Sequence, residues 1–524
     1  MKAAPALLVA CVLALVVSGS ASAKTSNDFS GHHRQVFRVV VVKGLTLSDL
    51  PQLATEGAVG LMVPNAGPRT SQADAFAGMV RGILYNTRLP KPHDTVLIHV
   101  TQSNVIPSHG PVIVVGLPPA TTAPNDRRYP IAVIGHGYRG LLISSLTRVP
   151  GLVSIADVAR TALQTPHALE TRRDGGPVAT SYRLEDEIDV ARSTTMPGSV
   201  LVLCLLVMFA VFYPRGSPTA LGSAIAVNLV MGWFPTGHTV PRVTLLGLCT
   251  VAGGLFGPTF FRRKSQLGLA LVVLLAAYAA SMLIRPSTLS LAPVGPELTS
   301  RFFGVSNLLE TWLLFPALLG AALLAKRFGW FAFLAIGGLA LATIAENALG
   351  SDGGGAIVVG VAFAVLAVEL LGARRRYIVP ALAAAAFIVF SLVNIDASVS
   401  GPDHLRGALH GGWNGFMSVA ANRVPLAYAR MVEQWWLLIP GLAVVIIGVA
   451  VARTARSRTE RAVATALLGG LAASLLVNDS PGPVMLAGLA AVLAIEGGIC
   501  NRTLTLPVLR RLAPPIAAAL PQEL

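Results

Sequence analysis

Charged residues are scarce in this chain of 524 residues. Asp, Glu, Lys and Arg make up 12% of the sequence, whereas 53% of the residues are hydrophobic. Soluble domains carry about 25% charged residues, so the composition excludes an ordinary soluble protein. The net charge of +15 does not indicate a nucleic-acid partner, because much of the excess lies in short turns between apolar runs, where it meets anionic lipid headgroups.

Cysteine is rarer still, and its placement excludes two kinds of site. The four cysteines all lie in apolar segments, at Cys11, Cys204, Cys249 and Cys500. Their spacing matches neither a disulfide framework nor a zinc site. We therefore expect no metal and no cofactor, and we expect the exported part of the chain to be held together by packing alone.

The N-terminus has the pattern of a secretory signal peptide. Met1-Lys2 is followed by an apolar stretch over residues 6–17, and Ala21-Ser22-Ala23 stands before Lys24. A short apolar core with a small-x-small cleavage site predicts a signal peptide over residues 1–23. The alternative is an uncleaved first membrane helix, for which the run is short. Under both interpretations, the segment that follows is exported.

From Met196 onward the sequence predicts an all-α polytopic membrane domain over residues 196–500, followed by a tail over 501–524. About eleven apolar runs are each near the ~20 residues that cross a bilayer. These runs are 196–213, 219–235, 243–261, 266–284, 309–325, 329–347, 355–372, 377–394, 435–452, 461–477 and 483–500.

Basic residues cluster in every second gap between these runs. The clusters are Arg215, Arg262-Arg263-Lys264, Lys326-Arg327, Arg374-Arg375-Arg376, Arg453 to Arg461, and Arg502 to Arg511. The positive-inside rule places such turns in the cytoplasm. The sequence therefore predicts a multi-pass protein of the bacterial plasma membrane, with an extracytoplasmic N-terminal domain and a cytoplasmic C-terminus.

The exported segment is predicted to be an α/β domain over residues 24–169. Strands are expected at 36–42, 94–100, 111–116 and 131–134, and a helix at 71–85. Alternating strands and helices favour a mostly parallel sheet with helices on both faces. The polar residues 170–195, which include Gly175-Gly176, are expected to form a linker.

Three segments of this domain resemble the alkaline-phosphatase superfamily of metal-dependent phosphatases, sulfatases and phosphoglycerol transferases. VVVVKGLTLSDL at 39–50 resembles the opening strand, and DTVLIHVTQSN at 94–104 resembles a strand that runs into a metal-binding Asp-His pair. TRVPGLV at 147–153, followed by DVART at 157–161, resembles a late stretch of the family. The resemblance covers about a quarter of the chain and implies the same α/β fold.

Departures from the family pattern indicate a degenerate member without its metals. Lys43 stands where the family has a metal-binding Asp, and residues 101–104 replace the Asp-His pair. A two-metal site needs several carboxylates and histidines, so we expect a catalytically dead domain. The family nucleophile falls at Thr70 or Ser71.

The vacated site has two interpretations. In the first, Lys43, Arg69 and His136 together bind a phosphate or another anion in place of the metals. In the second, Lys43 pairs with a local carboxylate and His136 is an ordinary loop residue.

Polar residues near the predicted outer ends of the membrane helices are candidates for chemistry, because charges inside membrane segments are expensive. Glu310 lies in such a segment, and the late outer loop at 395–434 is rich in arginine and histidine. Ordinary interface residues that reach into headgroups are the alternative.

The segment RFFGVSNLLETW at 301–312 resembles the R-x-x-G…N helix of O-antigen ligases and polymerases. Those proteins have a long outer loop with essential Arg and His late in a chain of many helices, the place that residues 395–434 take here. The resemblance implies that arginines hold a carrier diphosphate while a histidine acts as acid or base. The expected catalytic residues are Arg301, Glu310, Arg406, His410 and Arg423.

Together these features predict a protein of cell-envelope assembly that handles a lipid-linked or anionic substrate at the outer face of the membrane. If it is an enzyme, it is a metal-independent transferase that acts on a polyprenyl-linked substrate. The alternatives are a transporter or flippase, and a non-catalytic scaffold whose exported domain binds other envelope proteins. The expected partners are membrane lipids, a glycan linked to polyprenyl (di)phosphate or another envelope precursor, and envelope proteins, but no nucleic acid.

Overall fold

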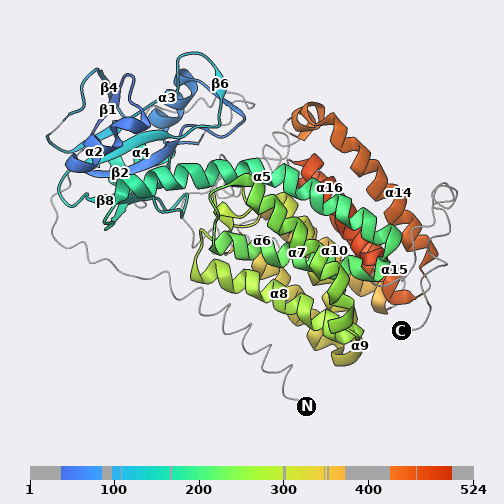
Figure 1. The fold of residues 1–524 in the computed structure, drawn as a ribbon. Coiled ribbons are helices and arrows are strands. Elements are labelled where there is room, and N and C mark those ends of the chain that lie inside the picture. The colour runs from blue at the N-terminus through green and yellow to red at the C-terminus, as the bar shows by residue number, and fades with distance from the viewer. Residues whose placement is uncertain are drawn as a thin grey trace.

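The structure is a computed structural model that describes residues 37–84, 97–107, 109–165, 168–298, 302–346, 349–350, 353–371, 425, 427–455, 457–478 and 480–497. An N-terminal α/β region lies at one end of a large bundle of apolar helices (Figure 1). The two-part organisation expected from the sequence is therefore present.

The α/β region is built on one twisted sheet. Its strand order is β10-β8-β2-β7-β5-β1-β4, with β9 also pairing with β2. Strands β7 and β10 run antiparallel to their neighbours, and the other pairs are parallel, so the expected mostly parallel sheet is confirmed. The strands are β1 (Arg38–Val42), β2 (Ala58–Val63), β4 (Val100–Ser103), β5 (Val112–Val115), β7 (Tyr129–Ile134), β8 (Gly140–Ile143), β9 (Leu152–Ser154) and β10 (Glu170–Arg172).

The strand expected at 94–100 is displaced toward the C-terminus. In the structure Leu97 precedes the strand, and β4 begins only at Val100, which pairs with Val39. The polar residues of β4 resemble a loop in the sequence because β4 is the last strand of the sheet, where one side faces water.

Helices cover both faces of the sheet, as expected. Helices α3 (Gln72–Arg81) and α4 (Ala156–Ala162) pack on one face around Met79 and Val158. On the other face lie η1 (Leu47–Asp49), α2 (Leu50–Glu56) and the first half of helix α5. This second core also contains Leu291 and Phe302 from the connection between two later helices.

The expected linker at 170–195 is wrong. Residues 170–172 form strand β10, and Pro177–Phe212 form the single 36-residue helix α5 (Figure 1). Leu184 and Ile188 of its polar first half fill the core under the sheet, whereas Val202 and Leu206 of its apolar second half lie in the core of the bundle. One rigid helix therefore joins the two parts.

The bundle contains six helices that are long and apolar enough to cross a membrane, and two shorter apolar ones, within the described residues. Ten of the eleven predicted runs overlap described helices, and the run at 377–394 lies outside the described residues. After α5 and η2 (Pro214–Gly216), the helical elements are α6 (Ser217–Trp233), α7 (Thr239–Phe260), α8 (Lys264–Ile284), η3 (Leu289–Leu291), α9 (Asn307–Ala345), α10 (Gly353–Leu371), η5 (Trp435–Leu437), α14 (Leu438–Thr454), α15 (Arg458–Val477) and α16 (Pro481–Ile495).

Helix α9 is a hairpin rather than one straight rod. Its 39 residues contain a break at Gly329, where φ is 70° and ψ is −156°. A straight helix of that length would span about 58 Å. Instead, the N–H of Val305, just before α9, donates to the carbonyl of Gly350, just after it, at 3.0 Å. The two halves must therefore return to the same end of the bundle, and they correspond to the predicted runs 309–325 and 329–347.

The connections between helices lie at two opposite ends of the bundle. At the domain-facing end are the turns around 234–238 and 478–480 and the connection 285–306, whose Phe302 enters the core of the α/β region. At the other end, here called the basic end, Arg327 contacts Ser265 at 3.5 Å and Arg458 donates to the carbonyl of Glu369 at 2.7 Å. The basic residues near the ends of the described helices that lie there are Arg215, Arg262, Arg263, Lys264, Lys326, Arg327, Arg453, Arg458 and Arg461.

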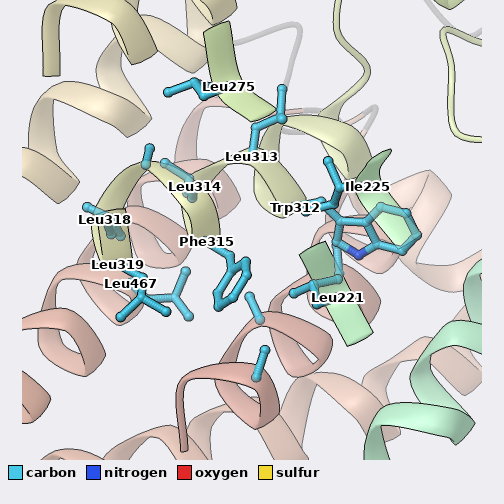
Figure 2. Packing of buried hydrophobic residues seen from close by; sticks show 14 of the residues in the cluster. Leu221, Ile225, Leu275, Trp312, Leu313, Leu314, Phe315, Leu318, Leu319 and Leu467 are labelled. Atoms are coloured by element: carbon cyan, nitrogen blue, oxygen red, sulfur yellow. The ribbon is translucent and has the colours of Figure 1, made fainter. Parts of the chain in front are cut away.

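The core of the bundle is apolar and closely packed around the first half of α9. Figure 2 shows Trp312 gathered with Leu221 and Ile225 of α6, and Phe315 on the same stretch of α9. Glycines allow the close approaches: a Cβ atom at Gly254 of α7 would overlap the ring of Phe209 of α5. The pair Gly253-Gly254 therefore serves helix packing.

Candidate functional site

Four of the five expected catalytic residues, Arg301, Arg406, His410 and Arg423, lie outside the described residues. The fifth, Glu310, occupies the first turn of α9 at the domain-facing end, and its side chain is fully buried.

The expected anion site of the α/β region does not form as one cluster. Lys43 directly follows β1, at the carboxyl edge of the parallel strands. Arg69 comes after β2, in the short strand β3 (Arg69–Thr70), which pairs with β6 (Ala123–Pro124) in a separate two-stranded sheet. His136 follows β7, and because β7 runs antiparallel to β5, this residue lies at the opposite edge. The sequence could not show this reversal, so the expectation that His136 joins Lys43 is wrong.

Of the two hydroxyls at the position expected for a nucleophile, that of Ser71 has a structural role. Ser71 caps α3: its Oγ accepts from the N–H of Asp74 at 3.2 Å and donates to the Asp74 carboxylate at 2.6 Å. Thr70 is only 1% exposed. Asn125 fastens the preceding turn, because its Nδ2 donates to the side chain of Asn65 at 2.8 Å and to the carbonyl of Gly67 at 2.9 Å.

The α/β region contains a fully buried carboxyl group. Asp157 of α4 is fully buried and accepts from the N–H of Ser154 at 2.8 Å. Burial raises the pKa of Asp157 to about 6, although hydrogen bonds from Ser144 and Ser154 and the charge of Arg160 act to lower it. Near neutral pH, the ionised carboxylate of Asp157 therefore lowers the stability of the folded state.

The most polar described part of the bundle lies around Glu310. Asn478, just after α15, donates from Nδ2 to Oε2 of Glu310 at 3.2 Å and to Oγ of Ser474 at 2.7 Å. All three side chains are buried. Such groups are tolerated between apolar helices only when they are bonded, so this arrangement is a built feature and not a chance contact.

The turn that contains Asn478 also contacts an arginine, Arg430. The guanidinium of Arg430 hydrogen-bonds to the hydroxyl of Ser480 and lies 3.5 Å from the carboxylate of Glu297. Arg430 is mostly buried, but Glu297 is exposed. We call this group, Glu310, Asn478, Ser480, Arg430 and Glu297, the polar cluster; it unites four segments that are distant in the sequence.

The polar cluster combines two chemical abilities. The buried carboxyl of Glu310 can exchange a proton, and its hydrogen bond from Asn478 fixes its direction. The guanidinium of Arg430 can hold two oxygens of a phosphate or diphosphate. The contact of Arg430 with the exposed Glu297 is worth little, so an anion can replace that carboxylate.

Sequence reasoning missed Asn478, Ser480 and Glu297. Asn478-Asp479-Ser480-Pro481 is a polar turn between two apolar runs, and that interruption is the signal that could have directed attention to it. Arg430 belongs to the predicted late loop but carries no motif that separates it from the other arginines there.

The α/β region is fixed to the bundle by a buried ion pair. Nε of Arg128 lies 2.6 Å from Glu185, and its NH2 lies 2.5 Å from Asp189, both on α5. Burial lowers the pKa of Arg128, but the hydrogen bonds and charges of the two carboxylates outweigh this effect, and the pKa is raised. The guanidinium of Arg148 also lies 3.9 Å from the ring of Phe303, in the connection that precedes α9.

A cleft of about 740 Å³ opens beside this junction, between α5 and the turn before α7. Its charged groups are largely engaged: Arg183 pairs with Glu187 at 2.7 Å, and Asp189 pairs with Arg128. Among the described residues, no group of three or more His, Cys, Asp or Glu side chains is placed to hold a metal ion.

Comparison of this chain with protein-family models, with curated proteins and with solved structures finds no match. The assignment of a function therefore depends on the residues and their geometry.

Proposed function

We propose that this protein is a multi-pass protein of the bacterial plasma membrane that handles an anionic, lipid-linked substrate of envelope assembly at the domain-facing end of its helices. That end is the extracytoplasmic one in this proposal, since the basic turns lie at the opposite end. The chain then crosses the membrane about eleven times after an N-terminal signal peptide, and the α/β region is a metal-free relative of the alkaline-phosphatase fold.

The observation that carries the proposal is the polar cluster. A buried carboxyl and an arginine are bonded to one turn, Asn478 to Glu310 and Ser480 to Arg430, at the domain-facing end of the bundle. Arg430 binds the diphosphate of a polyprenyl carrier, and Glu310 exchanges a proton with the group that attacks it or leaves it. Arg301, Arg406, His410 and Arg423 complete this site in the proposal.

In the catalytic form of the proposal, the protein is a metal-independent transferase. Glu310 removes the proton of an acceptor hydroxyl as its oxygen attacks the glycan. The bond between the glycan and the carrier diphosphate breaks, and the diphosphate leaves with the bonding electrons, held by arginine.

Binding of a radiolabelled polyprenyl diphosphate to the full-length protein in nanodiscs tests the proposal. Losing a charge-assisted hydrogen bond costs about 1.5–3 kcal/mol, so Arg430→Ala is expected to weaken binding by roughly one to two orders of magnitude. Arg453→Ala removes the same charge at the basic end and is expected to leave binding unchanged. Glu310→Gln is expected to retain binding and to fail in complementation of a deletion strain. Equal binding by wild type and Arg430→Ala would reject the proposed site.

The second candidate is a non-catalytic scaffold. The observation that favours it is the firm attachment of the α/β region, through Arg128 and the shared core, to the helix that enters the bundle. If Glu310→Gln and Arg430→Ala both complement fully at normal abundance, the scaffold becomes the better description. Crosslinking of the exposed surface of the α/β region in cells would then be expected to recover a specific envelope protein.

A further inference from the structure

The basic end of the bundle contains a patch of five cations from two separate turns. Arg262, Arg263 and Lys264 join α7 to α8, while Lys326 and Arg327 lie just before the break in α9. The two turns contain no acidic residue between positions 261 and 266 or between 325 and 330. The guanidinium of Arg327 contacts Oγ of Ser265 at 3.5 Å, which brings the two turns together. We call these five residues the basic patch.

Two helix N-termini add to the positive potential of the basic patch. Helix α8 begins at Lys264, and the second half of α9 begins after Gly329, so the positive ends of both helix dipoles lie at this level. Five exposed cations in two turns that contain no carboxylate repel one another, and binding an anion relieves that repulsion. A topology signal alone requires positive charge in each turn but does not require the two turns to touch.

Exposed aromatic rings mark the boundary of the membrane around the basic patch. Phe260 at the end of α7 and Phe331 in the second half of α9 are about three-quarters exposed, and Trp330 is partly exposed. Trp330 is held by an edge contact with Phe333 at 5.1 Å between ring centroids. Aromatic side chains at the ends of membrane helices sit at the level of lipid headgroups. The anion that reaches the basic patch is therefore a headgroup whose acyl chains lie along these rings.

We propose that the basic patch is a binding site for an anionic phospholipid with two phosphates, of the cardiolipin type. The two turns supply two adjacent groups of cations, one for each phosphate, and the exposed rings supply the apolar surface for the acyl chains. Basic pockets between membrane helices are a known mode of headgroup recognition. This site is separate from the polar cluster, which lies at the opposite end of the helices.

Native mass spectrometry of the detergent-purified full-length protein, titrated with cardiolipin, tests the site. Each cation near an anionic headgroup strengthens binding about five-fold, so Lys326→Gln/Arg327→Gln is expected to weaken cardiolipin binding by about ten-fold or more. The matched control, Arg453→Gln/Arg461→Gln, removes the same charge at the same end of the bundle but outside the basic patch. It is expected to bind cardiolipin as the wild type does. Phosphatidylcholine, which carries no net charge, is expected to bind all three proteins equally weakly.

The location is tested separately by fluorescence. Brominated cardiolipin is expected to quench tryptophan emission of the wild type, and Trp330→Phe is expected to lose most of that quenching. Equal weakening by the two double variants would show attraction by net charge alone and would overturn the proposal, as would unchanged binding in both. If the Lys326/Arg327 variant is poorly folded by gel filtration, Arg262→Gln/Arg263→Gln provides the same test on the other turn.

Discussion

At the domain-facing end of the bundle several polar side chains are buried and hydrogen-bonded, whereas at the basic end the arginine and lysine side chains of the described residues are exposed. Glu310 is buried against Asn478, and the buried Arg242 donates to the carbonyls of Thr236 and Leu291 at 2.7 and 3.0 Å. At the basic end Arg262, Lys264 and their neighbours point outward. Buried polar groups persist only when structure or function needs them, and this difference is the reason why we propose specific chemistry at the domain-facing end and lipid contact at the basic end.

The largest effect is expected in a labelling experiment that tests which end of the bundle faces out of the cell. In a background without the native cysteines, Gly237→Cys at the domain-facing end should react with an impermeant maleimide in intact cells. Arg262→Cys should react only after the membrane is permeabilised. Both positions are exposed, and a side chain at Gly237 meets no neighbouring atom. The reverse pattern would place the polar cluster in the cytoplasm and remove the basis of the proposed function.

Breaking the ion pair at the junction should cause the largest loss of stability. Arg128→Ala leaves the carboxylate of Glu185 largely buried without its partner, which costs about 3–5 kcal/mol. We expect a clear fall of the melting temperature in detergent and rapid proteolysis of the α/β region. Arg173→Ala removes the same charge from an exposed position just before α5, is expected to change stability by less than about 0.5 kcal/mol, and serves as the control. A similar melting temperature for both variants would show that the α/β region is only loosely attached.

The buried Asp157 predicts a dependence of stability on pH. Because the folded pKa is raised from 3.8 to about 6, the folded state binds the proton more tightly than the unfolded state. The contribution of Asp157 to the free energy of unfolding is therefore greatest below about pH 4. It falls as the pH rises through 6, and above that value it is lower by about 3 kcal/mol. The melting temperature of the wild type should rise between pH 7.5 and 5.5, and Asp157→Asn should rise less. Exposed Asp186→Asn is the control, and an Asp157→Asn profile parallel to the wild type would refute the assignment.

The smallest expected effect concerns the tip of the α9 hairpin at the basic end. Gly329 has a positive φ that only glycine adopts easily, so Gly329→Ala should cost about 1–3 kcal/mol. Gly338→Ala lies within the helix in open space and should be neutral or slightly stabilising, by up to about 1 kcal/mol. The difference between the two melting temperatures measures the strain at the turn. No difference would mean that the two halves of α9 do not need this turn.

The sequence predicted the apolar helices well because length and hydrophobicity alone define them. The sequence-based prediction failed on α5, whose first half was taken for a linker. Its many charged residues after Gly175-Gly176 are typical of a linker, although Leu184 and Ile188 are four residues apart, as a buried helix face requires. The prediction also missed β2, and it placed the edge strand β4 too early because the polar residues of β4 have no strong local pattern.

The candidate site was predictable only in part. Glu310 was found because a carboxylate inside an apolar run is conspicuous. Its partner Asn478 was not, because the contact joins residues 168 positions apart, a pairing that no local pattern records. The prediction for His136 failed for the same reason. The direction of β7 depends on its pairing with strands that are distant in the sequence, and no local pattern shows it.

The shared core beneath the sheet has a consequence for biosynthesis. The strands of the α/β region are complete by Arg172, yet Leu291 and Phe302 belong to the same core. At about 5–20 residues per second, a ribosome needs roughly 10 s to make that interval. During this time the core around Leu50 and Leu53 lacks the side chains of Leu291 and Phe302. Slowed translation between α5 and α9 is therefore expected to leave the α/β region sensitive to proteases for longer.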